Sequence, residues 1–243
     1  MLDSKENQEI QKLFTVTEAQ VNRDHAISHT LAVLQKMKTE FVFFGGTALS
    51  RTFLGVGRLS EDIDLYSENR RALCLELDQL PALLSEEFPQ AFWNVPPSQT
   101  ADSQSSLLNC DSSTRINVQV VNSRTRDWSK IPTMLTNISQ RYSDAPSVKL
   151  RTPILDGFVV MKASAWFERR SPRDLFDLEG LSHKVEVTES IQDLVVQVMG
   201  FRLSKQMMSG RISGLWHEEL AHQTKLTKTE DECLKRVLAW WER

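Results

Sequence analysis

Two short groups of residues have the types and the spacing that phosphoryl or nucleotidyl transfer requires: Gly45-Gly46-Thr47 and Asp62-Ile63-Asp64. A Gly-Gly turn at a helix N-terminus lets backbone N–H groups and the Thr47 hydroxyl approach a triphosphate, and the helix dipole favours the anion. Residues two apart in a strand point to one face, so Asp62 and Asp64 would share one Mg²⁺ with substrate phosphates. Either group alone is compatible with a plain turn or a solvated strand end. Together, in this order, they predict metal-dependent nucleotidyl or phosphoryl transfer.

The elements around these groups are short strands and a short helix. An apolar run at 40–44 predicts a buried strand, Thr47 opens a short helix, and 63–66 reads as a second strand. Residues 115–121 alternate apolar with polar side chains, which is typical of a half-buried strand that extends the same sheet. The spacing therefore places the glycine turn and the carboxylates at one edge of a sheet.

Helical periodicity dominates the rest of the chain. The first forty residues predict two helices, or one helix broken near Asn22, and 70–88 predicts another. Residues 89–106 read as a loop or a weakly paired edge, 148–150 as a short strand, and the chain from Ile154 onward as helical. We expect an α/β (α+β) fold: a catalytic domain over 1–150, with a helical N-terminal arm plus a sheet, and a helical domain over 151–243.

Composition narrows the function classes. With 243 residues, 40% hydrophobic and 25% charged, the sequence is typical of a globular protein. Cys74, Cys110 and Cys233 are widely spaced, which argues against a disulfide framework or a zinc site. The polar start and the short apolar runs predict no signal peptide, no anchor and no membrane partner, so we expect a cytoplasmic protein. The net charge of -3 excludes a general nucleic-acid coat and leaves only local basic patches.

Four blocks of the chain resemble a known family. Residues 45–51 (GGTALSR), 58–65 (RLSEDIDL), 162–170 (KASAWFERR) and 173–178 (RDLFDL) look like the signatures of the AbiEii/AbiGii toxin family. That family belongs to the polymerase-beta-like nucleotidyltransferases. The resemblance implies a nucleotidyltransferase-fold N-terminal domain with a mixed sheet, followed by a helical C-terminal domain that contributes Lys162 and Asp177 to the cleft.

The resemblance also implies roles for individual residues. The family's functional positions fall on the nucleotide-holding Gly46 and Thr47, the metal-binding Asp62 and Asp64, the essential Lys162 and the late Asp177. Gly45 and Arg51 in the first block and Asp174 in the last are further nucleotide-binding candidates. The implied cofactor is Mg²⁺ or Mn²⁺, with an NTP as substrate.

Characterised members of the family add nucleotides to the 3′ end of transfer RNA (tRNA), which blocks translation, and a cognate antitoxin encoded nearby neutralises them. The resemblance therefore implies a toxin of a toxin-antitoxin or phage-defence system, with tRNA as acceptor. Two other classes stay open: a nucleotidyltransferase that acts on a small molecule of the aminoglycoside kind or on a protein hydroxyl, and a non-catalytic binding module of the same fold.

Several of these residues also have plainer explanations. Lys162 could be a solvated lysine on an amphipathic helix. Ser171-Pro172 has the form of a helix start, which gives Asp174 the position of a capping residue. Asp177, one turn later, is the better candidate for orienting Lys162, and its plainer role is a salt bridge to Arg173.

One departure from the superfamily pattern concerns a third carboxylate, which related enzymes commonly carry on a later strand. The best strand here offers Asn117 and Gln119 on its polar face instead. A neutral amide cannot replace a carboxylate at a second Mg²⁺, which leaves full two-metal catalysis in doubt.

Two further patterns favour structural roles. His25 and His29 are four residues apart and could bind a metal, but the sequence nearby offers no third ligand, which favours packing. Trp240-Trp241 could stack bases, but docking of a terminal helix on the core is the simpler role.

Overall fold

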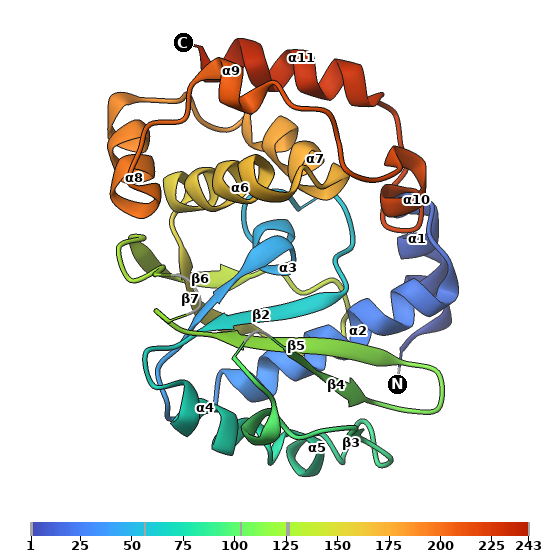
Figure 1. Cartoon of the computed structure of the whole chain (residues 1–243). Helices are drawn as coiled ribbons and strands as arrows, with labels where there is room; N and C mark the ends of the chain where they lie inside the picture. Colours follow the sequence, from blue (N-terminus) through green and yellow to red (C-terminus); the bar gives the residue numbers. More distant parts are fainter. Residues whose placement is uncertain (1, 56, 103, 125–126, 243) are drawn as a thin grey trace.

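The computed structural model describes residues 2–55, 57–102, 104–124 and 127–242. Its centre is a five-stranded mixed sheet in the order β1-β2-β5-β4-β3, in which only the β2–β5 pair is parallel (Figure 1). The strands are β1 (Val42–Phe44), β2 (Asp62–Tyr66), β3 (Phe92–Trp93), β4 (Ser105–Asn109) and β5 (Arg115–Val121). The predicted mixed sheet is confirmed, and the alternation at 115–121 marks the bounds of β5 correctly.

Three helical segments form a layer on one face of this sheet. They are α2 (Glu18–Leu34), α4 (Arg70–Leu77) and α5 (Leu80–Leu83). The inward residues of β2 and β5, such as Ile63 and Val118, are buried among them. Because side chains alternate along a strand, Asp62, Asp64, Asn117 and Gln119 project from the opposite face. One face of the sheet is therefore core, and the other carries the polar residues singled out by the sequence.

The N-terminal arm consists of two helices, α1 (Ser4–Phe14) and α2, which confirms the first of the two predictions, and the alternative of one helix broken near Asn22 is wrong. The break lies at 15–17, because Thr15 adopts a left-handed conformation (φ 58°) and the Thr17 hydroxyl accepts a hydrogen bond from the Gln20 N–H as the N-cap of α2. Asn22 lies inside the second helix.

A separate two-stranded sheet follows, formed by β6 (Thr133–Ile138) and β7 (Val148–Pro153). The sequence predicted β7 in part and missed β6, and β7 also packs against β1. The expected domain boundary at residue 150 falls within β7, so the helical part begins at Leu155.

The remaining chain is helical, as predicted, and lies above the sheet in Figure 1. Its helices are α6 (Leu155–Arg169), α7 (Pro172–Leu181), α8 (Glu189–Met199), α9 (Lys205–Met208), α10 (Trp216–Leu220) and α11 (Glu230–Trp241). Trp240 and Trp241 are buried and donate from their indole N–H groups to the carbonyls of Val185 and Leu203, both at 2.7 Å. These tryptophans therefore dock α11 on the core, in the simpler of their two expected roles.

The three cysteines are buried free thiols, and their wide spacing in the sequence had argued against a disulfide framework. Within the described residues, no helix combines the length and apolar character that crossing a bilayer would demand.

Candidate active site

Asp62 and Asp64 lie on the same face of β2, as the sequence predicted. Parallel pairing with β5 sets Asp62 opposite Asn117 and Asp64 opposite Gln119. The Asn117 side-chain amide donates to Asp62 Oδ1 at 3.0 Å, which fixes that carboxylate in place. The two paired positions on the neighbouring strand therefore carry amides where a third carboxylate was sought.

Gly45 and Gly46 begin α3 (Gly45–Ser50) and place backbone directly against the site. Gly45 has φ +79°, and a Cβ there would lie far inside van der Waals contact with Asp64 Oδ2. A Cβ on Gly46 would lie 2.5 Å from Arg58 Nη2. Gly45 needs glycine because of its positive φ and the Asp64 side chain, whereas a side chain at Gly46 would displace the Arg58 guanidinium.

The surroundings of the Asp64 carboxyl disfavour its ionised form. Burial, together with the nearby Asp62 carboxylate, raises its pKa from 3.8 to about 6, although Lys162 and Arg169 act in the opposite direction. Two carboxylates held this close repel each other when both are ionised. A divalent cation between them would remove this repulsion.

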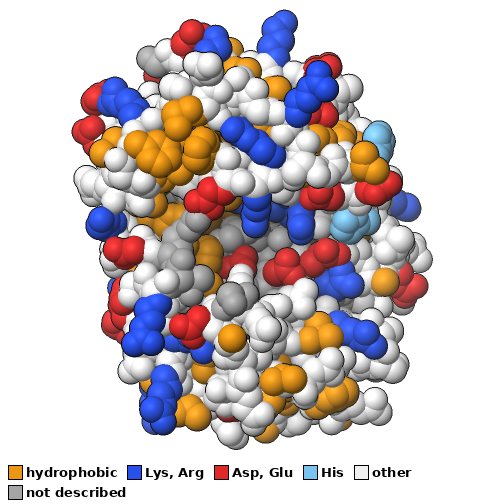
Figure 2. Space-filling model, viewed as in Figure 1, with side chains coloured by type: hydrophobic (Ala, Val, Ile, Leu, Met, Phe, Trp, Pro, Cys, Tyr) orange, Lys and Arg blue, Asp and Glu red, His pale blue; other side chains and the backbone are white. Residues whose placement is uncertain are grey.

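A cavity of about 350 Å³ opens beside Asp64 and is bounded by both parts of the chain. Its lining combines glycine backbone, polar groups and apolar side chains: Phe44, Gly45, Gly46, Asp64, Gln119, Val121, Trp128, Phe158, Met161, Lys162, Ala165, Glu168, Arg169 and Asp174. Figure 2 shows a hollow across the middle of this face, with basic side chains above it and acidic ones below. A pocket of this composition suits an anionic ligand with an apolar or aromatic part.

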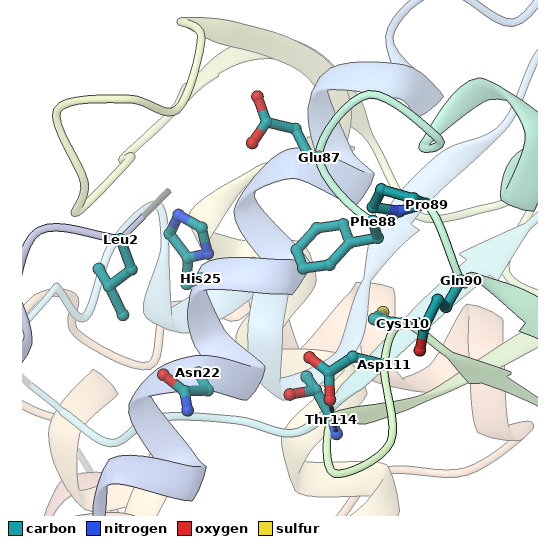
Figure 3. A pocket seen from close by; sticks show the side chains of 10 residues that line it. All are labelled: Leu2, Asn22, His25, Glu87, Phe88, Pro89, Gln90, Cys110, Asp111 and Thr114. Carbon is teal, nitrogen blue, oxygen red and sulfur yellow. Dashed lines mark hydrogen bonds between the residues drawn. The ribbon is translucent and has the colours of Figure 1, made fainter.

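A second cavity, drawn in Figure 3, lies around His25 and Phe88. Among the described residues, it shares no lining residue with the cavity beside Asp64. Since none of the candidate residues of the nucleotidyl-transfer site lines it, we place the active site at the smaller cavity.

Lys162 reaches the cavity from α6, held by two carboxylates of α7. Its Nζ atom lies 3.1 Å from Asp174 Oδ1 and 2.7 Å from Asp177 Oδ2. Only 8% of the Lys162 side chain is exposed, so it is not a solvated lysine. A buried ammonium at the wall of a cavity is placed to meet phosphate oxygens.

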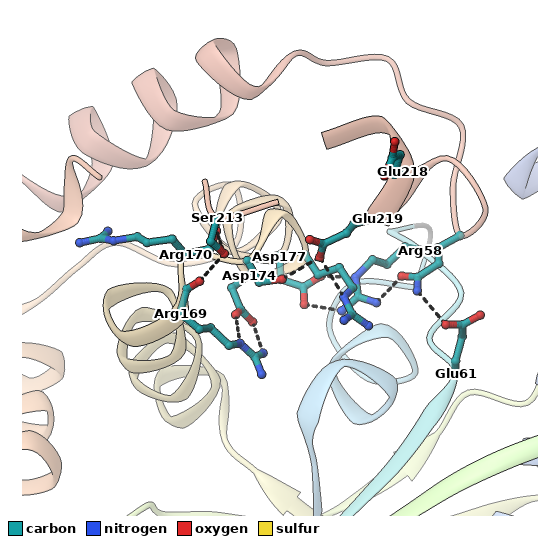
Figure 4. A network of polar contacts seen from close by, with 12 residues as sticks. Arg58, Glu61, Arg169, Arg170, Asp174, Asp177, Ser213, Glu218 and Glu219 are labelled. Atoms are coloured by element: carbon teal, nitrogen blue, oxygen red, sulfur yellow. Dashed lines mark hydrogen bonds and ion pairs between the residues drawn. The ribbon is translucent and has the colours of Figure 1, made fainter. Parts of the chain in front are cut away.

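Each of the two carboxylates has a second cationic partner (Figure 4). Arg58 donates to Asp177 through Nε at 3.0 Å and Nη2 at 2.9 Å, and Arg169 donates to Asp174 through Nε at 2.6 Å and Nη2 at 2.9 Å. These bidentate pairs join the segment before β2 to α7, and α6 to α7. The network thereby fixes Lys162 relative to the strand that carries the two aspartates.

Burial alone would raise the pKa values of both carboxyls, but their partners outweigh it. Lys162 and Arg169 hold the pKa of Asp174 at about 2. Arg58 and Lys162 hold the pKa of Asp177 below its usual value. Both carboxylates therefore stay ionised at neutral pH and hold the Lys162 ammonium in position.

The structure also tests the plainer roles that the sequence suggested for two residues of α7: helix capping by Asp174 and a salt bridge from Asp177 to Arg173. Ser171 holds the N-cap position, but its hydroxyl donates to Glu219 Oε2 at 3.2 Å. Asp174 is engaged by Lys162 and Arg169, so its role exceeds capping. The carboxylate 3.6 Å from Arg173 is that of Glu219, and Asp177 instead joins Arg58 and Lys162.

Two predicted nucleotide-binding residues do not join this group. The Thr47 hydroxyl is buried and donates to the backbone carbonyl of Asp62, so it secures α3 to β2. Arg51 is fully buried, with Nη2 2.7 Å from Asp24 Oδ1 and Nη1 2.9 Å from Ser28 Oγ. Both serve the framework behind the site, because hydroxyl and guanidinium face the core.

Arg58 and Arg169 were not among the predicted site residues, although both lie in the blocks that carry the family resemblance. Their partners are Asp177, far along the chain, and Asp174, across a helix boundary. The one available signal in the sequence was their position inside the blocks RLSEDIDL and KASAWFERR.

Comparisons with known proteins agree with this arrangement. The nucleotidyltransferase toxin MenT4 of Mycobacterium tuberculosis superposes with a TM-score of 0.64 at 18% identity, over 92% of this chain and 83% of its own. A candidate nucleotidyltransferase from H. pylori superposes with a TM-score of 0.55 at 14% identity, over 93% of this chain and 94% of its own. Among curated protein sequences, none matches. These likenesses show the nucleotidyltransferase fold.

The family model described as nucleotidyl transferase AbiEii toxin, type IV toxin-antitoxin system, matches residues 30–231. The match spans every residue of the active site described above and most of the chain. The chain therefore belongs to the AbiEii family of nucleotidyltransferase toxins.

Proposed function

We propose that this protein is a Mg²⁺-dependent nucleotidyltransferase toxin that transfers a nucleotide from an NTP to the 3′ end of tRNA and so blocks translation. The observation that carries the catalytic part is the meeting of Asp64, the Gly45-Gly46 backbone and Lys162 at one cavity. Family membership supports nucleotidyl transfer as the reaction and an antitoxin as partner.

The residues present fit a divalent cation. Asp62 and Asp64 offer hard carboxylate oxygens on one strand face. Burial and then the Asp62 carboxylate raise the pKa of Asp64 to about 6, and a bound cation would favour the ionised form of Asp64. When bound, Mg²⁺ would supply activation of the acceptor hydroxyl and stabilisation of the leaving pyrophosphate. Mn²⁺ suits the same oxygen ligands.

The chain's own residues bind and orient the nucleotide. The Lys162 ammonium neutralises phosphate charge, and the Asp174 and Asp177 carboxylates fix its direction. The glycine backbone leaves room for a triphosphate against β2. Apolar lining residues such as Trp128 and Phe158 offer a surface for the nucleoside. The site thus combines the N-terminal part of the chain, which carries the sheets through β7, with the helical part from Leu155 onward, which supplies Lys162 and Asp177.

A tRNA acceptor is supported by exposed basic side chains: Arg169, which lines the cavity, and Arg173, which lies close enough to act electrostatically on Asp64. The side chains of Arg169 and Arg173 are 63% and 40% exposed. Basic groups there could contact the phosphates of an acceptor strand, while the net charge of -3 limits binding elsewhere. Reaction with tRNA implies action in the cytoplasm.

Transfer of label identifies the reaction and the acceptor together. The purified protein is incubated with Mg²⁺, each α-³²P-labelled NTP in turn, and total tRNA, with Asp64→Asn as the matched control. We expect label in tRNA with the wild type only, lost on digestion of the terminal nucleotides. Label transferred in the absence of RNA to a small molecule or to protein would replace the tRNA proposal, and no transfer with any acceptor would indicate a non-catalytic module.

A further inference from the structure

Away from the active site, three metal-ligating side chains meet at one point. His25 and His29 lie one turn apart on α2, and Asp144 lies in the connection between β6 and β7. The two His Nε2 atoms are 3.2 Å apart, and Asp144 oxygens lie 3.0 Å from His25 Nε2 and 3.6 Å from His29 Nε2. The fold therefore supplies the third ligand that the sequence near the two histidines lacks.

These separations match the edges of a metal coordination tetrahedron. Zn²⁺ binds His nitrogen and Asp oxygen at about 2.0–2.2 Å, which puts neighbouring ligand atoms about 3.3 Å apart. We propose that His25, His29 and Asp144 form a binding site for a divalent transition metal, with Zn²⁺ as the ion that this ligand set favours. Nitrogen and carboxylate ligands together suit such a metal better than they suit Mg²⁺.

Hydrogen bonding alone leaves the two histidines imperfectly matched. His25 Nε2 faces both His29 Nε2 and the Asp144 carboxylate, and the single proton that this nitrogen can carry serves only one of these two contacts. A cation would satisfy all three at once. Burial and the neighbouring His25 also lower the pKa of His29.

Packing holds the ligands in this geometry. His25 and His29 are 6% and 4% exposed, and their rings make edge contacts with each other and with Phe88. The Tyr142 ring, two residues before Asp144, packs edge-on against His25 with centroids 5.0 Å apart. Ligands with restricted side-chain freedom lose little entropy when a metal binds.

The site is open on one side. His25 lines the cavity of about 480 Å³ in Figure 3, together with Glu87, Asn22 and Asp111. This opening gives an ion a path to the ligands and gives a water molecule room to complete a fourth coordination position. Glu87 adds negative charge near His29, which favours a cation there.

The location suggests a structural effect. A bound metal would tie α2 to the β6–β7 connection, and the same two segments already share the Asp24–Arg141 ion pair and the hydrogen bond from Tyr142 to Asp24 at 2.9 Å. Helix α2 lies on the core side of the sheet, whereas Asp62 and Asp64 project from the other face. We therefore expect the metal to stabilise the fold without taking part in nucleotidyl transfer.

Zinc binding can be measured directly on the full chain. After treatment with a chelator and its removal, the protein is titrated with ZnCl₂ by calorimetry in excess Mg²⁺, which occupies the active site. We expect one Zn²⁺ per chain and a rise in Tm on zinc addition. Asp144→Asn and His29→Gln should bind at least about 10-fold more weakly and lose the rise in Tm. His217→Ala, which removes an exposed histidine, and Asp64→Asn should bind like the wild type.

Asp144→Asn is the decisive variant, because its side chain is 24% exposed and the amide keeps the size of the carboxylate, so the chain should fold. Circular dichroism checks the fold of each variant. A folded wild type that takes up no Zn²⁺, or an Asp144→Asn variant with unchanged zinc affinity, would overturn the proposal. Loss of zinc binding in Asp64→Asn would instead locate the zinc at the active site.

Discussion

Asp177 Oδ2 lies 2.7 Å from Lys162 Nζ, and both oxygens of the same carboxylate accept hydrogen bonds from Arg58. The contact joins α7 to α6 beside the cavity, and the pair from Arg58 continues it to the segment that leads into β2. The position of the lysine is thus coupled to the position of the metal-binding strand. Loss of either partner should affect both stability and catalysis, to different degrees.

Lys162→Met should lower kcat by about 10²–10³-fold, because it removes the ammonium that meets phosphate charge. Its effect on stability should be smaller than that of Asp177→Asn, since Arg58 and Arg169 still pair with the two aspartates. Asp177→Asn leaves Arg58 and Lys162 short of a buried counter-charge and should cost about 3–5 kcal/mol. Urea unfolding and steady-state transfer kinetics measure the two effects. A Lys162→Met enzyme with normal kcat would exclude Lys162 from the chemistry.

Gly45→Ala should abolish activity, and backbone strain alone should not account for the loss. Gly45 and Gly200 have φ values of +79° and +82°, but only at Gly45 would a Cβ strike Asp64, and nothing lies within 4 Å of the corresponding position at Gly200. Both substitutions should cost about 1–2 kcal/mol for the left-handed conformation. Transfer assays should show loss of activity for Gly45→Ala alone. Similar activity in the two variants would mean that the close approach to Asp64 is unimportant.

Asp64→Asn should make the metal-free protein more stable at neutral pH. The folded-state pKa of about 6 exceeds the ordinary 3.8, so ionised Asp64 opposes folding, with a penalty that appears as pH rises through 4–6 and is complete above 6. Since the side chain partly faces the cavity, we expect a gain of roughly 1–2 kcal/mol at pH 7.5. Thermal unfolding should show a higher Tm for the variant at pH 7.5 and a difference that disappears near pH 4.

Mg²⁺ supplies the control for that comparison. It should raise the Tm of the wild type at pH 7.5, lose this effect below pH 6 as Asp64 takes up a proton, and leave Asp64→Asn nearly unchanged. A variant less stable than the wild type at pH 7.5 without metal would show that Asp64 is not destabilising.

Arg51→Met should reduce stability without weakening nucleotide binding. Its guanidinium is buried against Asp24, so truncation leaves that carboxylate with Arg141 and Tyr142 alone and should cost about 3–5 kcal/mol. The KM for NTP of the folded fraction should remain within about twofold, because Arg51 does not reach the cavity. A large rise in KM with unchanged stability would return Arg51 to the nucleotide site.

Local patterns in the sequence predicted the parts of the fold that depend on neighbouring residues. Alternation at 115–121 located β5, and helical periodicity from Ile154 located the helical part. The alternative of a break near Asn22 was wrong because the apolar pattern continues across residues 15–17. There the left-handed Thr15 ends α1 and the Thr17 cap begins α2. Strand β6 was missed because its residues do not alternate cleanly and its stability comes from pairing with β7.

The same distinction between local patterns and distant contacts explains which site residues could be predicted from the sequence. Asp62, Asp64 and the two glycines form a local pattern, so sequence reasoning found them. The Arg58–Asp177 pair and the meeting of Asp144 with His25 join residues far apart in the chain, which no local period encodes. Arg51 lies in the same block as the glycines, but its side chain faces the core, and burial depends on the whole fold.

The central claim, that Asp62 and Asp64 with Lys162 form a nucleotidyl-transfer centre, is tested most directly by pyrophosphate release coupled to label transfer. The wild type, Asp62→Asn, Asp64→Asn and the control Gly200→Ala are each given Mg²⁺, all four α-labelled NTPs and total tRNA. The account predicts equal amounts of pyrophosphate and transferred label with the wild type and Gly200→Ala, and loss of both with either aspartate variant. Label transfer that survives in folded Asp62→Asn and Asp64→Asn would contradict it.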